Sequence, residues 1–445
     1  MADTTLPMVK PEQTGVGSYF VANYPPFSVW SSEAVEADAM PALHAAPVPG
    51  VPLGLYLHVP FCRKRCHFCY FRVYTDKNAQ DVARYLDTLV GEWELYSRLP
   101  AIAGRPLDFV YFGGGTPSFL STRQLSSLVS RLAAITPWDQ AREVTFECEP
   151  GTLTEGKLAA IRDLGVTRLS LGVENFDDAL LELNGRAHRS PEIFRAYKEA
   201  RDLGFAQINV DLIAGMLGET EENWQACIRR TLELAPDSVT VYQMELPYNT
   251  TISGDLLKGE GRFAQGPATW PTKRRWVAEA FEALEREGYQ VISAYTAVRK
   301  PGETRFVYTD RVWQGADLAG LGVASFGHIN GVHLQNRDTW EAYNAEVAAG
   351  RLPLGRAYRP TDEERFIREF VLQLKRGSVR TAYFRDKFGV DVVTRFEPEL
   401  TELRSEGVLQ AFTNEAITLS RDGLLQVDAI LRRFFLPQHA GIRYS

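Results

Sequence analysis

Three cysteines, Cys62, Cys66 and Cys69, fall within eight residues in a C-x3-C-x2-C pattern, just after an apolar run that ends at Val59. A closed structural zinc site uses four ligands, and no fourth ligand with metal-site spacing follows. Three thiolates on one short loop instead favour an iron–sulfur cluster with one iron left open for chemistry. A zinc knuckle and three unrelated cysteines are the alternatives, but three of the chain's five cysteines stand here.

The loop that carries these cysteines is basic. Arg63, Lys64 and Arg65 separate the first cysteine from the second. Because positive charge stabilises a thiolate, we expect lowered cysteine pKa values and a partial offset of the cluster's negative charge.

Polar groups also follow the next two apolar runs. Glycines 113–115 precede Thr116 after the run 109–112, and Glu147 ends the run after that. Glycines let a ligand approach the backbone closely and leave N–H groups free for an anionic group. The carboxyl ends of parallel strands meet at one edge of a sheet, so we expect these residues to share one site with the cysteines.

Short apolar runs alternate with amphipathic segments of helical length, which predicts an α/β fold with a parallel sheet covered by helices. The predicted strands are residues 53–59, 109–112, 143–147, 168–172, 208–214 and 238–243. The predicted helices between them are residues 80–97, 121–134, 154–164, 190–203 and 221–234.

Composition narrows the class of protein. The chain has 445 residues, 45% of them hydrophobic and 24% charged, and no apolar run approaches the roughly 20 residues that span a bilayer. Residues 1–50 lack a signal peptide, so we expect a soluble protein in the reducing cytoplasm. The net charge of −7 argues against nucleic-acid binding and favours a small-molecule substrate.

The cysteine triad resembles that of the radical S-adenosylmethionine (SAM) superfamily. The resemblance implies a partial (β/α)6 barrel and a 4Fe-4S cluster whose unique iron is chelated by SAM. It further implies that an electron, supplied by a donor such as flavodoxin or ferredoxin, splits SAM to a 5′-deoxyadenosyl radical.

Longer stretches resemble a narrower group, the oxygen-independent coproporphyrinogen III dehydrogenases and their relatives. These stretches are residues 168–177, 183–188, 209–215, 312–315, 320–326 and 417–425, together with Tyr19 and residues 23–26 near the start. The resemblance implies three metal ligands, Cys62, Cys66 and Cys69. It implies contacts to the first SAM from Tyr56, Gly113, Gly114, Thr116, Glu147, Glu174, Arg186 and Asp211. A second SAM would be bound by Gln314 and by the loop 324–329, which begins at Ala324.

Two positions depart from the dehydrogenase pattern. Phe71 stands where the dehydrogenase has a fourth cysteine, and Glu174 stands where it has glutamine. We take these departures to favour the class C radical SAM methyltransferases, in which the second SAM donates carbon for methylation or cyclopropanation of an sp² carbon. The alternatives are oxidative decarboxylation of coproporphyrinogen III in heme biosynthesis and a heme-binding carrier without radical chemistry.

Other residues are weaker candidates for chemistry. Tyr56 and Glu245 are our catalytic candidates, and Glu245 is expected to donate or accept a proton in the substrate pocket with Tyr242 and Tyr248. His58, His67, His328 and His333 either assist the site or are structural histidines. Cys148 and Cys227 are expected to be buried, unreactive thiols.

We divide the chain into four parts. Residues 1–50 form a segment that covers the active site, 51–300 the barrel, 301–360 a segment with the glycine-rich loop, and 361–445 a helical lid. The order of elements in 361–445 resembles a winged helix, but its balanced charge offers no basic recognition helix for DNA.

Overall fold

The computed structural model describes residues 14–17, 19–258 and 266–442. The start of the predicted N-terminal segment, residues 1–13, lies outside the described residues, as do residue 18 and the last three residues of the predicted lid. No helix among the described residues is long and apolar enough to cross a membrane.

Six parallel strands form the centre of one large sheet. They are β1 (Leu53–Val59), β2 (Leu107–Gly114), β3 (Glu143–Cys148), β4 (Arg168–Glu174), β5 (Gln207–Ala214) and β6 (Ser238–Gln243), and they pair in chain order. All six predicted strands are confirmed to within two residues at each end. Their side chains are buried on both faces, as is usual for parallel strands covered by helices.

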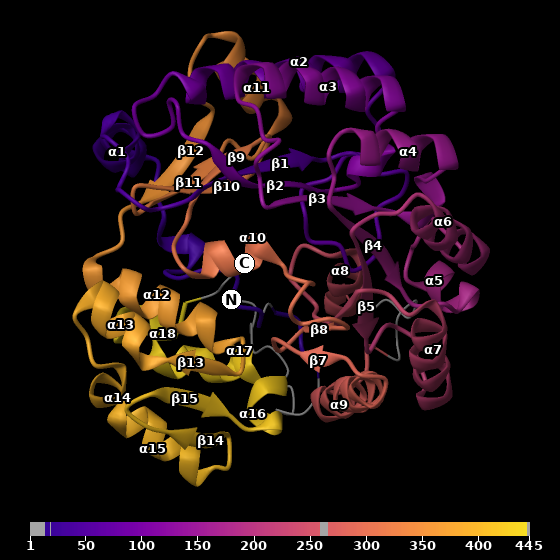
Figure 1. Ribbon diagram of the computed structural model, residues 1–445, viewed down its shortest axis with the longest axis vertical. Helices are drawn as coiled ribbons and strands as arrows, with labels where there is room; N and C mark the ends of the chain where they lie inside the picture. The colour runs from indigo at the N-terminus through magenta and orange to yellow at the C-terminus, as the bar shows by residue number, and fades with distance from the viewer. Residues whose placement is uncertain (1–13, 18, 259–265, 443–445) are drawn as a thin grey trace.

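Helices follow each of these strands and cover the outer face of the arc that the strands form (Figure 1). The five predicted helices correspond to α2 (Ala79–Ser97), α3 (Thr122–Ile135), α4 (Glu155–Asp163), α6 (Ser190–Asp202) and α7 (Glu221–Leu234). Asn78 and Ser121 form capping boxes at the starts of α2 and α3, which explains why these helices begin where the sequence indicates. The fold is a partial, open (β/α)6 barrel.

The sheet continues beyond the six predicted strands at both edges. Next to β1 lie β9 (Asp317–Leu321), β10 (Phe326–Ile329), β11 (Val332–Asn336) and β12 (Leu354–Tyr358), and beyond β6 lie β8 (Thr296–Val298) and β7 (Gln290–Val291). Strand β9 runs parallel to β1, whereas β10–β12 are antiparallel. The sequence suggested only a glycine-rich loop here, because Gly320 lies within β9 and Gly322 directly follows it.

The C-terminal residues form a second, smaller unit with its own apolar core. Its helices include α12 (Asp362–Leu374), α13 (Thr381–Phe388), α14 (Val392–Arg395), α15 (Glu397–Ser405), α16 (Arg421–Leu425) and α17 (Val427–Leu431). Strands β13 (Ser378–Arg380), β15 (Ala416–Leu419) and β14 (Leu409–Phe412) form its sheet. Phe370 is central to this core, with ring centroids 5.0 Å from both Phe396 and Phe434.

The described part of the N-terminal segment connects this unit to the barrel. The Val21 amide donates to Asp428 of the C-terminal unit at 2.8 Å, and Arg368 donates to the Asn23 side chain at 2.6 Å. Trp30 stacks on His333 of β11 with a ring-centroid distance of 5.0 Å. The segment therefore lies between the extended sheet and the C-terminal unit, across the open side of the arc from β4 and β5 (Figure 1).

Candidate functional site

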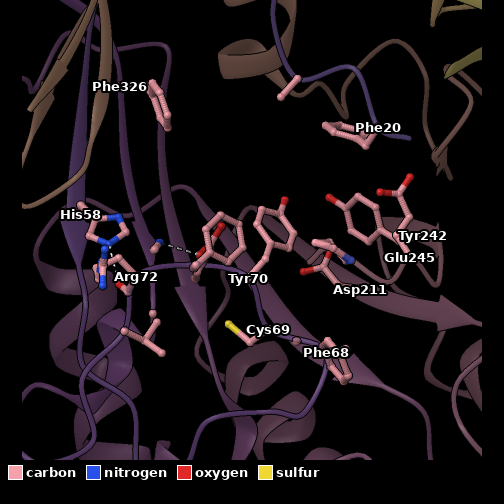
Figure 2. Close-up of a pocket in the computed structure, with 18 of the residues that line it drawn as sticks. Phe20, His58, Phe68, Cys69, Tyr70, Arg72, Asp211, Tyr242, Glu245 and Phe326 are labelled. Atoms are coloured by element: carbon pink, nitrogen blue, oxygen red, sulfur yellow. Dashed lines mark hydrogen bonds between the residues drawn. The ribbon is translucent and has the colours of Figure 1, made fainter. Parts of the chain in front are cut away.

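A single large cavity opens at the carboxyl ends of the parallel strands. Its volume is about 1590 Å³. Its lining includes all three cysteines of the triad, the ends of β1–β6, the loop after β9, and parts of the N-terminal segment and of α17. In Figure 2, Cys69 and Phe68 lie on one side of this space, Phe20 and Phe326 lie on the opposite side, and Tyr70 and Tyr242 stand between them.

The cysteine loop is anchored to its surroundings by hydrogen bonds. The Cys62 amide donates to the Tyr74 carbonyl at 3.1 Å, and the Cys69 amide donates to the Cys66 carbonyl at 3.1 Å. Two sulfurs accept hydrogen bonds from the barrel: the Thr116 hydroxyl donates to Cys62 Sγ at 3.3 Å, and Arg186 Nη1 donates to Cys66 Sγ at 3.2 Å.

The pKa values of two of these cysteines contradict our expectation from the basic loop. Burial raises the pKa of Cys62 to about 11 and that of Cys69 to about 12, so desolvation outweighs the nearby positive charge. Arg63 contributes little because its guanidinium is bound at 2.9 Å by Glu149, which neutralises it. Metal binding at this loop must therefore release protons.

The residues around the triad fit an iron–sulfur cluster. Within the described part of the chain, no three histidine, cysteine or acidic side chains converge as they do on a single metal ion. A four-iron cluster differs because three of its irons each take one thiolate and the fourth stays open, so three separated sulfurs on one loop are suitable ligands. Beside them, Arg186 Nε is buried and has no hydrogen-bond partner, which leaves a donor for an anionic group.

Three carboxylates line the wall above the cysteines. Glu147 accepts from the Tyr111 hydroxyl at 2.6 Å, Asp211 accepts from the Ser170 hydroxyl at 2.8 Å, and Glu174 lies 3.5 Å from the Arg186 guanidinium. Burial raises the pKa of all three, to about 7 for Glu147 and for Glu174. Glu174 also has a φ of +63°, an uncommon conformation that is found most often at functional sites.

Glycines 113–115 were expected to leave backbone N–H groups free for a ligand, but the structure gives them a packing role instead. The Gly114 amide donates to Glu147 at 3.2 Å, and the Gly115 amide donates to the Val59 carbonyl at 2.9 Å, so these two N–H groups are not free to bind a ligand. A Cβ on Gly114 would lie 2.5 Å from His58 Nδ1. The glycines are required because β1 and β2 approach so closely at this edge.

Our two catalytic candidates both line the cavity. Tyr56 stacks on Tyr111 with centroids 5.8 Å apart, and burial raises its pKa well above 10, which keeps the phenol protonated. Glu245 accepts from the Tyr19 amide at 3.1 Å, and burial raises its pKa to about 7. Tyr242 and Tyr248 line the same space.

The residues expected at a second SAM separate into two groups. Ala324 lines the cavity and has a φ of +60°. Gln314 is not among the described residues that line the cavity. It directly follows helix α10 (Val307–Trp313), and its carbonyl accepts a hydrogen bond from Lys387 of the C-terminal unit at 2.8 Å. Gly113 likewise lies behind the lining, in the strand itself.

Several arginines that line the cavity were not among the predicted site residues. Arg168 has a buried, unpartnered Nη1 and lies 4.0 Å above the Phe306 ring. Arg356 and Arg368 line the far end of the cavity, and among the described residues both guanidinium groups donate hydrogen bonds only to neutral oxygens. Arg168 could have been predicted as a site residue, because a charged side chain at the start of a buried strand is unusual. Arg356 could not have been predicted, because β12 itself was not predicted.

The cavity also presents aromatic rings that are unusually exposed for their type. Tyr70 and Phe71 are each 46% exposed, Tyr242 is 41% exposed and Phe326 is 36% exposed. Tyr70 and Phe71 stack on one another with centroids 4.4 Å apart, directly after the last cysteine of the triad. Exposed aromatic surface inside a cavity is typical of a binding site for a large, flat ligand.

Comparison with known proteins identifies relatives over most of the chain. Residues 56–230 match the Radical SAM superfamily. The oxygen-independent coproporphyrinogen III oxidase of Escherichia coli (strain K12) is 30% identical over 73% of this chain and 72% of its own length. The "Heme chaperone HemW" of Bacillus subtilis is 28% identical over 85% of this chain and 98% of its own length.

Among solved structures, coproporphyrinogen III oxidase (HemN) from Escherichia coli superposes with a TM-score of 0.80. It is 25% identical and covers 93% of this chain and 96% of its own. These matches overturn the expectation of methylation or cyclopropanation as the main activity. That expectation rested on Phe71 and Glu174, which are two substitutions within one cavity, whereas the likeness to the oxidases extends over the whole fold.

Proposed function

Since the chain belongs to the radical SAM superfamily and, within it, to the family of oxygen-independent coproporphyrinogen III oxidases, we propose that it oxidatively decarboxylates propionate side chains of a porphyrinogen. The observation that carries the proposal is the continuity of one cavity, which joins the cysteine triad to a chamber lined by exposed aromatic rings and unpaired arginines. When bound, the 4Fe-4S cluster and SAM supply a radical that removes hydrogen from an unactivated carbon.

The residues of this chain would divide the remaining tasks. Cys62, Cys66 and Cys69 would hold the cluster. Glu147, Glu174 and Asp211 would bind the cationic and hydroxyl groups of SAM, and Arg186 would bind its carboxylate, because guanidinium and carboxylate pair in a bidentate manner.

The far end of the cavity suits a carboxylated macrocycle. Stacking on Tyr70 and Tyr242 would orient a flat or bowl-shaped ring, and Arg356 and Arg368 would pair with propionates. Single ligands usually occupy pockets of roughly 300–1000 Å³. The larger volume here, about 1590 Å³, therefore leaves room for SAM and a second ligand together.

We further propose a reducing cytoplasm as the compartment and flavodoxin or ferredoxin as the electron donor. The exposed Lys64 and Arg65 beside the cysteines would attract such acidic proteins. The second SAM stays a prediction, which equilibrium dialysis would check by measuring whether one or two SAM molecules bind per reconstituted chain.

The test is an anaerobic assay of the reconstituted protein with reductant, SAM and coproporphyrinogen III. We expect 5′-deoxyadenosine together with a porphyrinogen that has lost carboxyl groups, both identified by mass spectrometry. The same assay with the Cys66→Ala variant is the control. Cleavage of SAM without any loss of carboxyl groups would refute the assignment of the substrate.

A heme carrier is the second candidate, because the chain covers 98% of the length of the Bacillus subtilis heme chaperone. A carrier would bind hemin stoichiometrically and would not consume SAM when a porphyrinogen is present. Titration with hemin, followed by its absorption spectrum, separates this function from the first.

A further inference from the structure

Two buried histidines at the far end of the cavity form a hydrogen-bonded pair. His328 Nδ1 lies 2.9 Å from His333 Nδ1, and the two residues face each other across the β10–β11 hairpin. His333 is fully buried beneath Trp30, whereas His328 is 8% exposed and lines the cavity. The cysteines lie on the loop after β1, and the three cavity carboxylates lie on β3, β4 and β5.

The hydrogen bonds fix which nitrogen carries the proton on each ring. His333 Nε2 lies 3.1 Å from the Tyr24 carbonyl oxygen, which can only accept, so Nε2 is the protonated nitrogen of His333. His333 Nδ1 is then a bare acceptor, which also suits the Asn23 amide at 3.5 Å. His328 must donate to it from Nδ1, and His328 Nε2 is left without a proton.

Burial, together with neighbouring positive charges, keeps both rings neutral. Among charged groups, the buried Arg368 guanidinium has the largest effect on both histidines, and Arg365 and Lys387 add to its effect on His328. Burial and these positive charges lower both histidine pKa values well below 6.5. No described residue hydrogen-bonds His328 Nε2, although the atom belongs to a residue on the cavity wall.

Two cationic side chains accompany this acceptor. Arg356 is held by the Phe27 carbonyl at 2.9 Å and by the Gln335 side chain, and Arg368 is held by Asn23 at 2.6 Å and the Val312 carbonyl at 3.3 Å. All of these hydrogen-bond partners are neutral, and the nearby carboxylates of Asp338 and Glu369 act on Arg356 and Arg368 only through space, without an ion pair among the described residues. The far end of the cavity thus combines one neutral acceptor with two anion-binding groups.

We propose that His328 Nε2 accepts a hydrogen bond from a ligand N–H group while Arg356 and Arg368 bind carboxylates of the same ligand. This inference rests on the proposed function, for which the ligand is a porphyrinogen with pyrrole N–H groups and propionates. His333 and the Tyr24 carbonyl are positioning groups, because they act on the ligand only by fixing the tautomer of His328. An amino acid end, such as that of SAM, carries the same two kinds of group and is the competing source.

The tautomers are tested first, without any ligand. Nitrogen-15 labelling of the histidines and long-range ¹H–¹⁵N correlation spectra distinguish a protonated from a bare ring nitrogen. We expect protonated Nδ1 and bare Nε2 on His328, with the reverse on His333, throughout pH 6 to 8. A protonated His328 Nε2 would overturn the proposal whatever the protein's activity.

The ligand is tested by anaerobic titration with coproporphyrinogen III in the absence of SAM, followed by the fluorescence of the tryptophans. We expect His328→Leu to weaken binding about tenfold, the effect of one net hydrogen bond, and His328→Gln to restore most of it through its side-chain oxygen. His44→Gln, which alters an exposed histidine at the end of helix α1 (Met40–His44), is the matched control and should change nothing.

A parallel titration with SAM separates the two sources of the N–H group. A loss of SAM affinity in His328→Leu, with porphyrinogen affinity unchanged, would overturn the assignment of the ligand. A heme spectrum that depends on His328 would assign Nε2 to iron binding and would overturn the hydrogen bond. If the unaltered protein binds no porphyrinogen, the proposed function fails. In that case the nitrogen-15 spectra alone decide whether His328 Nε2 is a hydrogen-bond acceptor.

Discussion

Cys66 is the cysteine of the triad whose sulfur contacts a buried guanidinium, at 3.2 Å from Arg186 Nη1. Replacing it with alanine removes one ligand of the cluster but little packing, because the side chain is only partly buried. We expect Cys66→Ala to abolish SAM cleavage and the cluster's visible absorption while the circular dichroism spectrum is unchanged. Cys227→Ala, which alters a buried thiol on α7, is the control and should retain cleavage. Retained cleavage in Cys66→Ala would contradict the cluster assignment.

Arg186 links the cysteine loop to the carboxylates, since it contacts Cys66, the Gly172 carbonyl and Glu174. Its Nε is a buried donor without a partner, which is costly unless a ligand accepts from it. Arg186→Ala should weaken SAM binding by about tenfold or more, measured by calorimetry on the reconstituted protein. Arg189→Ala removes a neighbouring, more exposed arginine and should leave the affinity unchanged. Equal affinities for both variants would remove Arg186 from the site.

The two glutamates with raised pKa values predict a pH dependence. Burial and neighbouring carboxylates raise the pKa of Glu147 and of Glu174 to about 7, so both are largely neutral at pH 6 and ionised at pH 8. The ionised forms attract the sulfonium and ammonium groups of SAM. Affinity for SAM should therefore rise up to about tenfold from pH 6 to pH 8, and Glu174→Gln should flatten that rise. A flat profile for the unaltered protein would show that neither carboxylate titrates in contact with SAM.

Some strands of the large sheet could be predicted from the sequence and others could not. Strands β1 and β6 have the bounds that their apolar runs predicted, since both faces are buried and turns flank them. Strands β9 to β12 were missed because glycines stand where another part of the chain approaches: a Cβ on Gly320 would lie 2.0 Å from the Phe326 carbonyl oxygen. Glycine placed for close packing has the same appearance in sequence as glycine placed in a loop.

The same distinction applies to the site. The cysteines and Glu147 were found from their places at strand ends, which local sequence reveals. Arg356, Arg368 and the histidine pair were missed or undervalued, because their roles depend on pairing between β11, β12 and the N-terminal segment. No local pattern contains information about such distant pairing.

Helix α2 carries a buried carboxyl that holds the turn after β9. Glu92 accepts from the Gly322 amide at 2.8 Å, the Tyr343 hydroxyl at 2.6 Å and the Asn336 side chain at 2.6 Å. Burial raises its pKa to about 8, so the folded chain holds this proton more tightly than the unfolded chain, whose carboxyl has a pKa near 4.5. The contribution of this proton to stability is complete below pH 4.5 and is lost as pH rises towards 8.

Glu92→Gln removes this titration. Between pH 6 and pH 8, the free energy of unfolding should therefore fall less in Glu92→Gln than in the unaltered protein, as measured by urea denaturation. Glu94→Gln, on the exposed face of the same helix, is the control and should follow the unaltered protein. Parallel pH profiles for all three proteins would refute the raised pKa.

In the whole molecule, Asp428 joins three parts of the chain. It accepts from the Val21 amide at 2.8 Å and from the Tyr295 hydroxyl, and it pairs with the buried Lys375 at 2.8 Å. Asp428→Ala would leave Lys375 as an unpaired buried charge, a loss of roughly 3–5 kcal/mol. We expect a clearly lower Tm by calorimetry, whereas Asp422→Ala on the exposed face of α16 should have little effect. A Tm equal to that of the unaltered protein would show that the junction does not hold the parts together.

The roof of the cavity consists of contacts between the two ends of the chain. Val21 and Asp428 are separated by 407 residues, and Arg368 lies 345 residues from Asn23. During synthesis, the two contacts cannot form before residues 428 and 368, respectively, have been made, whereas the cysteine loop and β1 to β6 are complete by residue 243. The nascent barrel thus passes through a period in which its metal-binding face is uncovered. In that period the cysteine loop would be most accessible to iron and sulfide.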